Sequence, residues 1–168
     1  MSHSLSSKAE FICNYLNDIG LRFSVTTHEA AHTLEKCTEI EKIIDGKICK
    51  NLFLQTTTGS AHYLLMMSGS KKFVTKEVSK AIGSSRLSFA SGEKMEDMLG
   101  TAPGSLSITS LVFDKEKKVA LVIDEDVLRE EFICCHPCDC TATLKIKTAD
   151  VIGILIPSLD ITPVIIGI

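Results

Sequence analysis

The chain has 168 residues, enough for one compact core, and its 18 basic and 21 acidic residues give a net charge of −3. This balance excludes a protein that coats nucleic acid through global basic charge, so any nucleic-acid contact is local. Seven cysteines without an amino-terminal apolar signal indicate a reducing compartment, and no apolar run is long enough to cross a bilayer. We therefore expect a single domain, residues 1–168, in the cytoplasm, with no membrane partner.

Capping and turn residues mark the ends of the expected helices. Ser7 and Glu10 have the spacing of a capping box, and Gly20 can close the helix that follows. Thr33 is a candidate N-cap for a short helix over residues 34–40. Two further helices are expected between Thr75 and Gly83 and between Ser91 and Gly100, and a last one starts at Thr148 or Asp150 and ends before Pro157.

Apolar and alternating runs predict the strands. Residues 50–55 and 62–67 flank a glycine-containing loop, which is typical of a β-hairpin. Residues 106–113 and 119–124 flank a charged turn and predict a second hairpin. The other expected strands are 23–25, 86–90, 132–135, 141–147 and 161–168. This mixed order of helices and hairpins favours an α+β fold over a doubly wound sheet.

Lys50 and Asn51 lie at the mouth of an otherwise apolar strand. A lysine there is costly to bury unless it meets an anion or does chemistry, so the stretch indicates a site. The alternative is a structural lysine whose stem packs on the sheet while its ammonium reaches water.

Gly104 and His136 are further candidates. Around Gly104, which follows Pro103, successive backbone N–H groups can point into one concavity, although a tight structural turn explains this segment equally well. His136 is held extended by Pro137, and a buried, hydrogen-bonded histidine is the alternative to a functional one.

A cysteine-rich stretch, Cys134–Cys140, gives a competing signal. Cys135 and Cys138 have the C-x-x-C spacing of a metal knuckle or a redox pair. One knuckle supplies only two ligands, and the other cysteines provide no second knuckle. We therefore expect small apolar side chains and no metal, and a metal or thiol-redox protein stays open as an alternative.

A group of basic residues is the best local candidate for tRNA contact. Lys76 and Lys80 lie four apart and would share one helix face. The full candidate set is Lys71, Lys72, Lys76, Lys80 and Arg86. The alternative is an ordinary solvated helix face.

Four segments together resemble a known family: Cys49–Leu54, Arg86–Ser91, Leu99–Ser105, and His136–Pro137 with Thr141–Leu144. In this order they are similar to the YbaK-like family of aminoacyl-tRNA deacylases, and within it to the free-standing prolyl-tRNA editing proteins of the ProX or PrdX type. The resemblance runs from about His28 to the last apolar strand. It implies an α+β domain with a mixed, largely antiparallel, partly barrel-like central sheet flanked by helices.

The resemblance also implies a function. It indicates trans-editing hydrolysis of mischarged tRNA(Pro), with Ala-tRNA(Pro) as the expected substrate, no cofactor, no DNA, and prolyl-tRNA synthetase as a candidate partner. A catalyst of this kind needs no side-chain nucleophile if the 2′-hydroxyl of the terminal ribose positions or activates water. A non-catalytic module that binds tRNA or a synthetase is the alternative.

The resemblance assigns roles to individual residues. Lys50, Gly104 and His136 are the expected catalytic residues, and Lys50 would help to hold the terminal adenosine. The expected substrate-binding residues are Thr33, Asn51, Ser105, Leu106, Ser107, Cys140 and Thr141. Two positions depart from the family. In this sequence, Ile108 takes the place of the proline in the family's G-x-x-x-P loop. Cys140 takes the place of the asparagine in the family's H-P-x-x-N-T-A-T segment.

Overall fold

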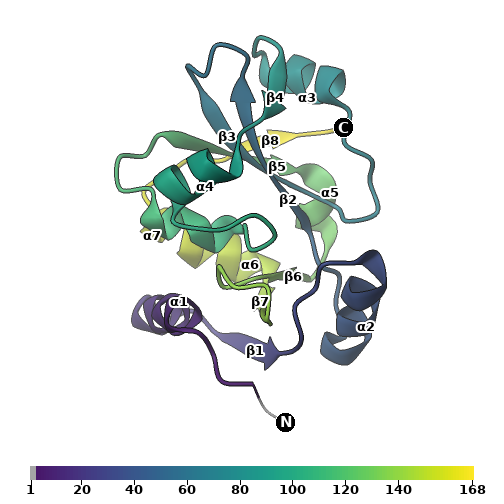
Figure 1. The fold of residues 1–168 in the computed structure, drawn as a ribbon, viewed down its shortest axis with the longest axis vertical. Helices are drawn as coiled ribbons and strands as arrows, with labels where there is room; N and C mark the ends of the chain where they lie inside the picture. The colour runs from purple at the N-terminus through teal and green to yellow at the C-terminus, as the bar shows by residue number, and fades with distance from the viewer. Residues whose placement is uncertain (1–2) are drawn as a thin grey trace.

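The computed structural model describes residues 3–168 as two β-sheets with helices packed on their faces (Figure 1). The helices are α1 (Ser7–Asp18), α2 (Leu34–Ile44), α3 (Thr75–Ile82), α4 (Gly92–Leu99), the 3-10 helix η1 (Ile108–Phe113), α5 (Glu125–Arg129), α6 (Thr148–Asp150), the π-helical segment η2 (Val151–Leu155) and α7 (Ile156–Ser158). The strands are β1 (Phe23–Thr27), β2 (Lys50–Thr56), β3 (His62–Met67), β4 (Leu87–Phe89), β5 (Val119–Asp124), β6 (Phe132–Cys135), β7 (Ala142–Lys147) and β8 (Val164–Ile166). The predicted α+β class is confirmed.

Both sheets are open. The smaller one has the order β1-β7-β6 and is antiparallel throughout. The larger one has the order β4-β2-β3-β5-β8, with antiparallel pairing around β2 and parallel pairing from β3 through β5 to β8. The expected partly barrel-like sheet is therefore not closed. The reason is that β7 pairs with β1 on one side and β6 on the other, and neither β6 nor β7 extends the larger sheet.

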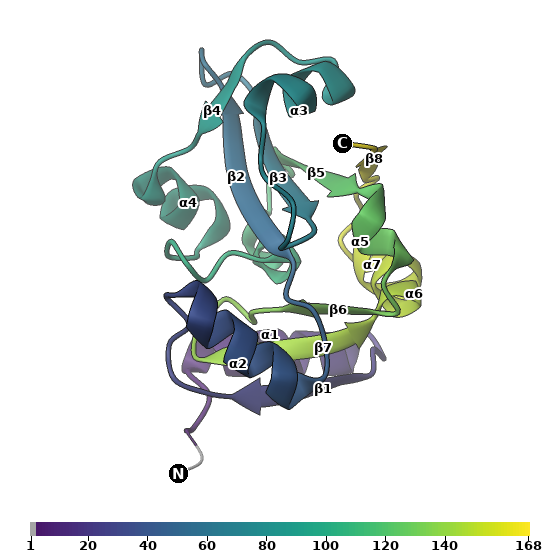
Figure 2. The same ribbon diagram turned by 90° about the vertical axis from the view of Figure 1, so that its right-hand side faces the viewer.

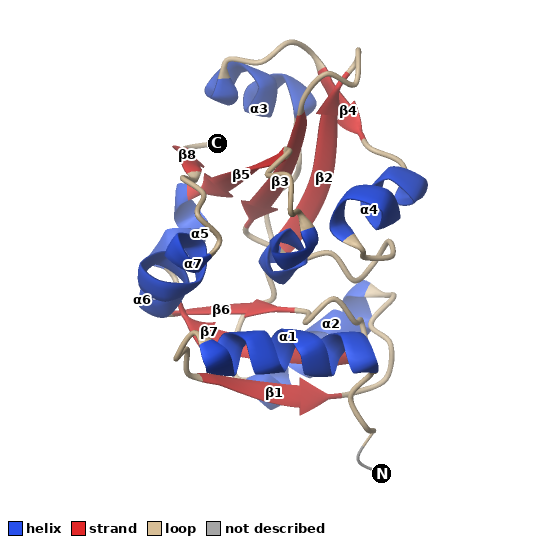
Figure 3. Ribbon diagram, turned by 90° about the vertical axis from the view of Figure 1, so that its left-hand side faces the viewer, coloured by secondary structure: helices blue, strands red, loops and turns tan. Residues whose placement is uncertain are grey.

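Helices cover both faces of each sheet. Helices α1 and α2 lie on opposite faces of the smaller sheet (Figures 2 and 3). On the larger sheet, α3 packs against the face that carries Leu54 and Met67. Helix α4 and η1 join α1 in the main core, which contains Phe53 and Leu64 from the other face. No helix within residues 3–168 is long and apolar enough to cross a membrane.

The capping residues explain where several helices begin and end. Thr33 caps α2 by accepting a hydrogen bond from the Lys36 N–H at 3.2 Å, as predicted. Ser91 caps α4 in the same way. The predicted capping box at Ser7 is wrong by one residue, because the Ser6 hydroxyl accepts from the Ala9 N–H and Ser7 is already helical.

The second predicted hairpin is also wrong. Residues 108–113 form η1, and β5 pairs in parallel with β3. Ser107 caps η1 and forms a reciprocal capping box with Ser110, which offers the backbone local partners in place of a strand ladder. Pro157 does not end the preceding helix, because α6, η2 and α7 follow one another without a break and the wider π-helical turn of η2 lies just before the proline.

Candidate active site

The loop between α4 and η1 contacts the loop between β6 and β7. The Ser105 hydroxyl accepts a hydrogen bond from the Cys140 N–H at 3.1 Å. The Ser107 and Thr109 hydroxyls both donate to the carbonyl oxygen of His136, at 2.5 Å and 3.1 Å. The structure therefore brings together two groups of sequence-predicted residues that are about thirty positions apart in the chain.

A buried group of hydroxyls supports these contacts from behind. The Ser110 hydroxyl accepts from the Ser107 N–H at 3.1 Å and from the Thr101 hydroxyl at 3.0 Å, and it lies 3.4 Å from the Cys138 sulfur. The network holds the start of η1 in place.

Gly104 provides a backbone conformation at the rim of this loop. Its φ of +90° is unfavourable for other residues, and a Cβ added there would meet no atom within 4 Å. The neighbouring Ser105 N–H donates to the Ala102 carbonyl oxygen at 3.1 Å, which closes a turn. Leu106 is buried in the main core, so its side chain anchors the loop.

His136 has a defined tautomer. Its Nδ1 lies 2.7 Å from the Ala142 carbonyl oxygen, and because a carbonyl only accepts, the proton is on Nδ1. Burial lowers the pKa of His136 and outweighs this hydrogen bond, and the nearby His28 lowers it further. The imidazole is therefore neutral at pH 7, and Nε2 carries a lone pair that can accept a proton or a hydrogen bond.

His28 is a candidate that the sequence did not indicate. Its ring centroid lies 6.2 Å from that of His136. Its Nδ1 donates to the Glu29 carbonyl oxygen, and its Nε2 accepts from the buried Thr143 hydroxyl, each at 2.7 Å. A lone histidine after a short strand belongs to no motif that the sequence could reveal. His28 lies near His136 because its backbone N–H pairs with the Thr141 carbonyl oxygen.

Cys140 and Thr141 connect this site to the start of α2. The Cys140 carbonyl accepts from the Ala31 N–H at 3.3 Å. The Thr141 N–H and hydroxyl both donate to one oxygen of Asp139, at 2.9 Å and 2.7 Å. Thr33 follows Ala31 closely in the chain, and its hydroxyl is occupied in capping α2.

Lys50 and Asn51 point to opposite faces of β2, as successive strand residues do. Asn51 is on the face of Phe53 and the main core. Its Nδ2 donates to the Cys49 carbonyl oxygen at 3.3 Å, and its buried Oδ1 has no hydrogen-bond donor among the described residues. Lys50 is on the face of Leu54, and its Nζ donates to the Lys71 carbonyl oxygen at 2.5 Å.

Lys50 lines a cleft of about 480 Å³ between α2 and the turn at residues 68–70. Cys37 and Ser70 stand on opposite walls of this cleft, whereas Gly104 and His136 do not line it. The residue before Lys50 contacts the strand that leads to His136, because the Cys49 N–H donates to the Cys134 carbonyl oxygen at 3.3 Å. The role of Lys50 stays a prediction.

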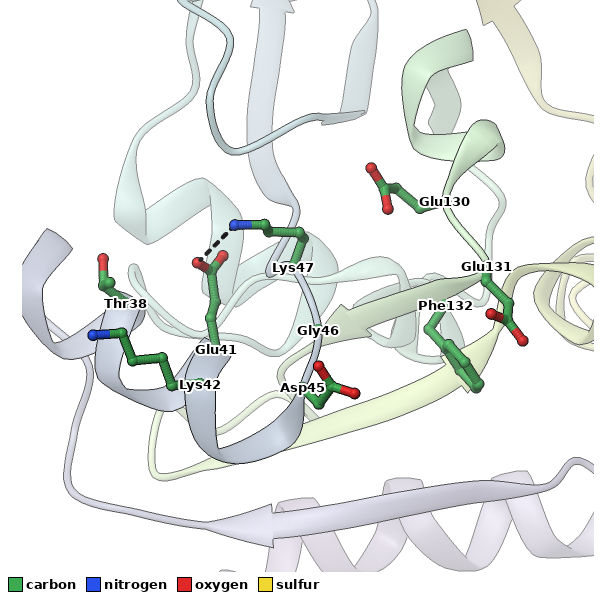
Figure 4. Close-up of a pocket in the computed structure, with 9 residues that line it drawn as sticks. All are labelled: Thr38, Glu41, Lys42, Asp45, Gly46, Lys47, Glu130, Glu131 and Phe132. Atoms are coloured by element: carbon green, nitrogen blue, oxygen red, sulfur yellow. Dashed lines mark ion pairs between the residues drawn. The ribbon is translucent and has the colours of Figure 1, made fainter.

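An adjoining pocket of about 490 Å³ lies between α2 and the start of β6 (Figure 4). Glu41 pairs with Lys47 at 3.9 Å on one side, and Glu130 and Glu131 lie on the other. None of the sequence-predicted site residues lines it. Its carboxylates would repel a phosphate backbone, so we place tRNA elsewhere.

Four of the five candidate tRNA contacts are exposed. These are Lys72, Lys76, Lys80 and Arg86, on and around α3. Lys71 differs, because its ammonium pairs with Asp124 at 2.8 Å and with Asp126 at 2.6 Å. Its charge is therefore already neutralised within the protein.

Three of the cysteine thiols have environments that suppress reactivity. Burial raises the pKa of Cys49 to about 12 and that of Cys134 to about 11, and it raises the pKa of Cys135 as well. A thiol acts as nucleophile or metal ligand in its thiolate form, which these environments disfavour. Within residues 3–168, no group of three or more histidine, cysteine or acidic residues is arranged to hold a metal ion.

Fold and site together define a class: an α+β protein whose loops present hydroxyls, backbone groups and a neutral imidazole. The model of the aminoacyl-tRNA editing domain family matches residues 28–154, and the chain belongs to this family.

Two curated relatives and one solved structure are similar to the chain. Prolyl-tRNA editing protein ProX of Acetoanaerobium sticklandii is 28% identical over 135 residues, 80% of this chain and 82% of the relative. Prolyl-tRNA synthetase associated domain-containing protein 1 of Danio rerio is 25% identical over 155 residues, 91% of this chain and 83% of the relative. A crystal structure of a proposed trans-editing enzyme for prolyl tRNA synthetase has a TM-score of 0.74 at 18% identity, covering 98% of this chain and 99% of that one. This last match shows the fold.

Proposed function

We propose that this protein is a trans-editing deacylase that hydrolyses the ester of mischarged tRNA(Pro), with alanyl-tRNA(Pro) as its substrate. The observation that carries the proposal is the contact between the Ser105–Ser107 loop and the His136–Thr141 segment in a chain of the editing family. The name of the relative from Acetoanaerobium sticklandii supports tRNA(Pro).

The proposed catalysis depends on orientation and electrostatics. The backbone around Gly104 faces the aminoacyl group, and Nε2 of His136 accepts a hydrogen bond from the substrate or the attacking water. The 2′-hydroxyl of the terminal ribose, held beside the scissile carbonyl, positions that water. The Lys50 ammonium binds the 3′-terminal adenosine near its phosphate. Asn51, with its free Oδ1, is a binding residue on the opposite face of β2.

Alanine is the proposed amino acid because of how a synthetase selects proline. A pocket built for proline cannot strongly exclude a smaller side chain, since losing a few methylenes changes binding by about 1–3 kcal/mol. A second site that admits alanine and rejects proline removes the error after transfer. Serine and cysteine are the nearest competitors, because Ile108 and Cys140 border the proposed pocket.

Deacylation of a panel of charged tRNAs tests this proposal. We expect hydrolysis of Ala-tRNA(Pro) well above the spontaneous rate, and little hydrolysis of Pro-tRNA(Pro) or Ala-tRNA(Ala). Binding of the same tRNAs without any hydrolysis would instead indicate a non-catalytic binding module. Adding prolyl-tRNA synthetase to the assay tests it as a partner, since a faster rate at low tRNA concentration would indicate assembly. We propose that residues 1–168 act as one domain and work in the cytoplasm.

A further inference from the structure

The turn that connects β3 to the segment before α3 packs tightly against the chain entering β2. The Lys71 N–H donates to the Ser68 carbonyl oxygen at 3.1 Å, which closes the turn. At Gly69, an added Cβ would lie 2.7 Å from the Ile48 carbonyl oxygen, so the turn can approach this closely only with glycine. The position of the turn is thus coupled to the backbone just before Lys50.

The Lys71 side chain ties the same turn to the end of β5. Its ammonium pairs with Asp124, which is fully buried, and with Asp126. It also donates to the Ile168 carbonyl oxygen. Burial alone would lower the pKa of Lys71, but the two carboxylates outweigh it and raise that pKa. Lys71 is therefore a charged, partly buried anchor that two carboxylates hold in place.

The backbone of Lys71 contacts the lysine of the cleft. Its carbonyl oxygen accepts the hydrogen bond from Lys50 Nζ at 2.5 Å. Ser68, Gly69 and Ser70 of the same turn line the cleft beside Lys50. Lys71 thus contacts two carboxylates through its side chain and the Lys50 ammonium through its backbone carbonyl oxygen.

We propose that Lys71 is a positioning residue for Lys50: its ion pairs with Asp124 and Asp126 fix the turn whose carbonyl oxygen aims the Lys50 ammonium into the cleft. This rests on the proposed role of Lys50 in binding the tRNA end. It also replaces direct tRNA contact as the role of Lys71. Without the anchor, Lys50 would sample several rotamers and lose the orientation that catalysis requires.

A double-mutant cycle with a conservative rescue tests the proposal. We expect Lys71→Met to lower kcat on Ala-tRNA(Pro) by about tenfold, Lys71→Arg to recover most of this loss, and Lys71→Met to have no further effect in a Lys50→Ala background. The proposal would be overturned if Lys71→Met lowered kcat equally in the wild-type and Lys50→Ala proteins, or if Lys71→Met kept full activity. Gly69→Ala moves the turn without changing charge, so the same pattern is expected of it if Lys71→Met does not fold.

A second readout does not depend on activity. In protein labelled with ¹³C at lysine Cε, the Lys50 signal is identified by its loss in Lys50→Arg. We expect Lys71→Met to shift and narrow this signal toward that of a solvent-exposed lysine, and Lys71→Arg to leave it in place. An unchanged Lys50 signal in a folded Lys71→Met protein would contradict positioning. If Lys50→Ala keeps full activity, the proposed role of Lys50 fails, and the Lys50 signal still decides whether Lys71 positions it.

Discussion

His136 and Lys50 are the two ionisable side chains in the proposed mechanism, and the fold holds them in different environments. His136 is neutral with its proton on Nδ1, whereas the Lys50 ammonium is held by a single backbone carbonyl at the edge of a cleft. The first can act as an acceptor and the second as a fixed positive charge. The sequence selected both residues, but it did not show these environments.

Replacing Lys50 tests the value of the positive charge. We expect Lys50→Ala to lower kcat/KM for deacylation by at least about tenfold, equivalent to roughly 1.4 kcal/mol of transition-state stabilisation. The protein should remain folded, because Lys50 is only partly buried. Steady-state kinetics with a circular dichroism control provides the measurement. Lys47→Ala, a change in the same cleft, is the matched control, and normal kinetics of folded Lys50→Ala would rule out the assignment.

The neutral imidazole of His136 predicts a pH dependence. Burial lowers the pKa of His136 from its usual 6.5, so activity should fall as the pH drops through a midpoint below that value, where Nε2 takes up a proton. The unfolded chain binds that proton first, so the free energy of unfolding should also decrease as the pH falls below about 6.5. The profile of kcat/KM against pH gives the midpoint. The fall of kcat/KM at low pH should disappear in His136→Gln. If that fall persists in the variant, it belongs to another group.

Gly104 should be sensitive to substitution because of its backbone. The φ of +90° costs another residue about 1–3 kcal/mol, so Gly104→Val should move the loop and reduce turnover. The space around the position is empty, so a steric clash inside the protein is not the cause. Gly153→Ala is the control, since its Cβ also meets nothing and its φ is ordinary. Unchanged deacylation by Gly104→Val would show that Gly104 is only part of a turn.

At the scale of elements, the features that depend on neighbouring residues were predicted correctly. The features that depend on contacts with distant residues were not. The cap at Thr33 and the hairpin of β2 and β3 follow from neighbouring residues. Residues 108–113 have the apolar, β-branched composition of a strand, but the hydroxyls of Ser107 and Ser110 bond within the segment and favour η1. The Ser107 hydroxyl also donates to the His136 carbonyl oxygen, a distant partner that the sequence does not reveal.

Helix α3 carries a prediction about tRNA binding. Lys76 and Lys80 share its exposed face, so Lys76→Glu/Lys80→Glu should weaken attraction to tRNA phosphates and raise KM by several-fold, with kcat nearly unchanged. The effect should diminish at high salt. Lys115→Glu/Lys147→Glu makes the same change in net charge at exposed positions elsewhere. An equal rise in KM in both double variants would point to overall charge, and no rise in the first would leave α3 as a solvated face.

At the scale of the whole molecule, the fold class and most of the elements could be predicted, but whether the sheets close could not. Local patterns identify strands, and pairing between distant strands decides whether a sheet closes. The β1-β7-β6 sheet pairs residues 23–27 with residues 142–146, which no local pattern specifies. The same long-range pairing brings His28 beside His136, a proximity that no local pattern in the sequence indicates.

Single-turnover hydrolysis of Ala-tRNA(Pro), with alanine on the 3′ position and with or without the terminal 2′-hydroxyl, tests the central claim most directly. The protein is proposed to orient its substrate and to use the substrate's own hydroxyl in place of a side-chain base or nucleophile. We predict rapid hydrolysis of the native substrate, loss of most turnover with the 2′-deoxy substrate at equal occupancy, and similar binding of both. Equal rates on the two substrates, or no hydrolysis of the native one, would contradict this account.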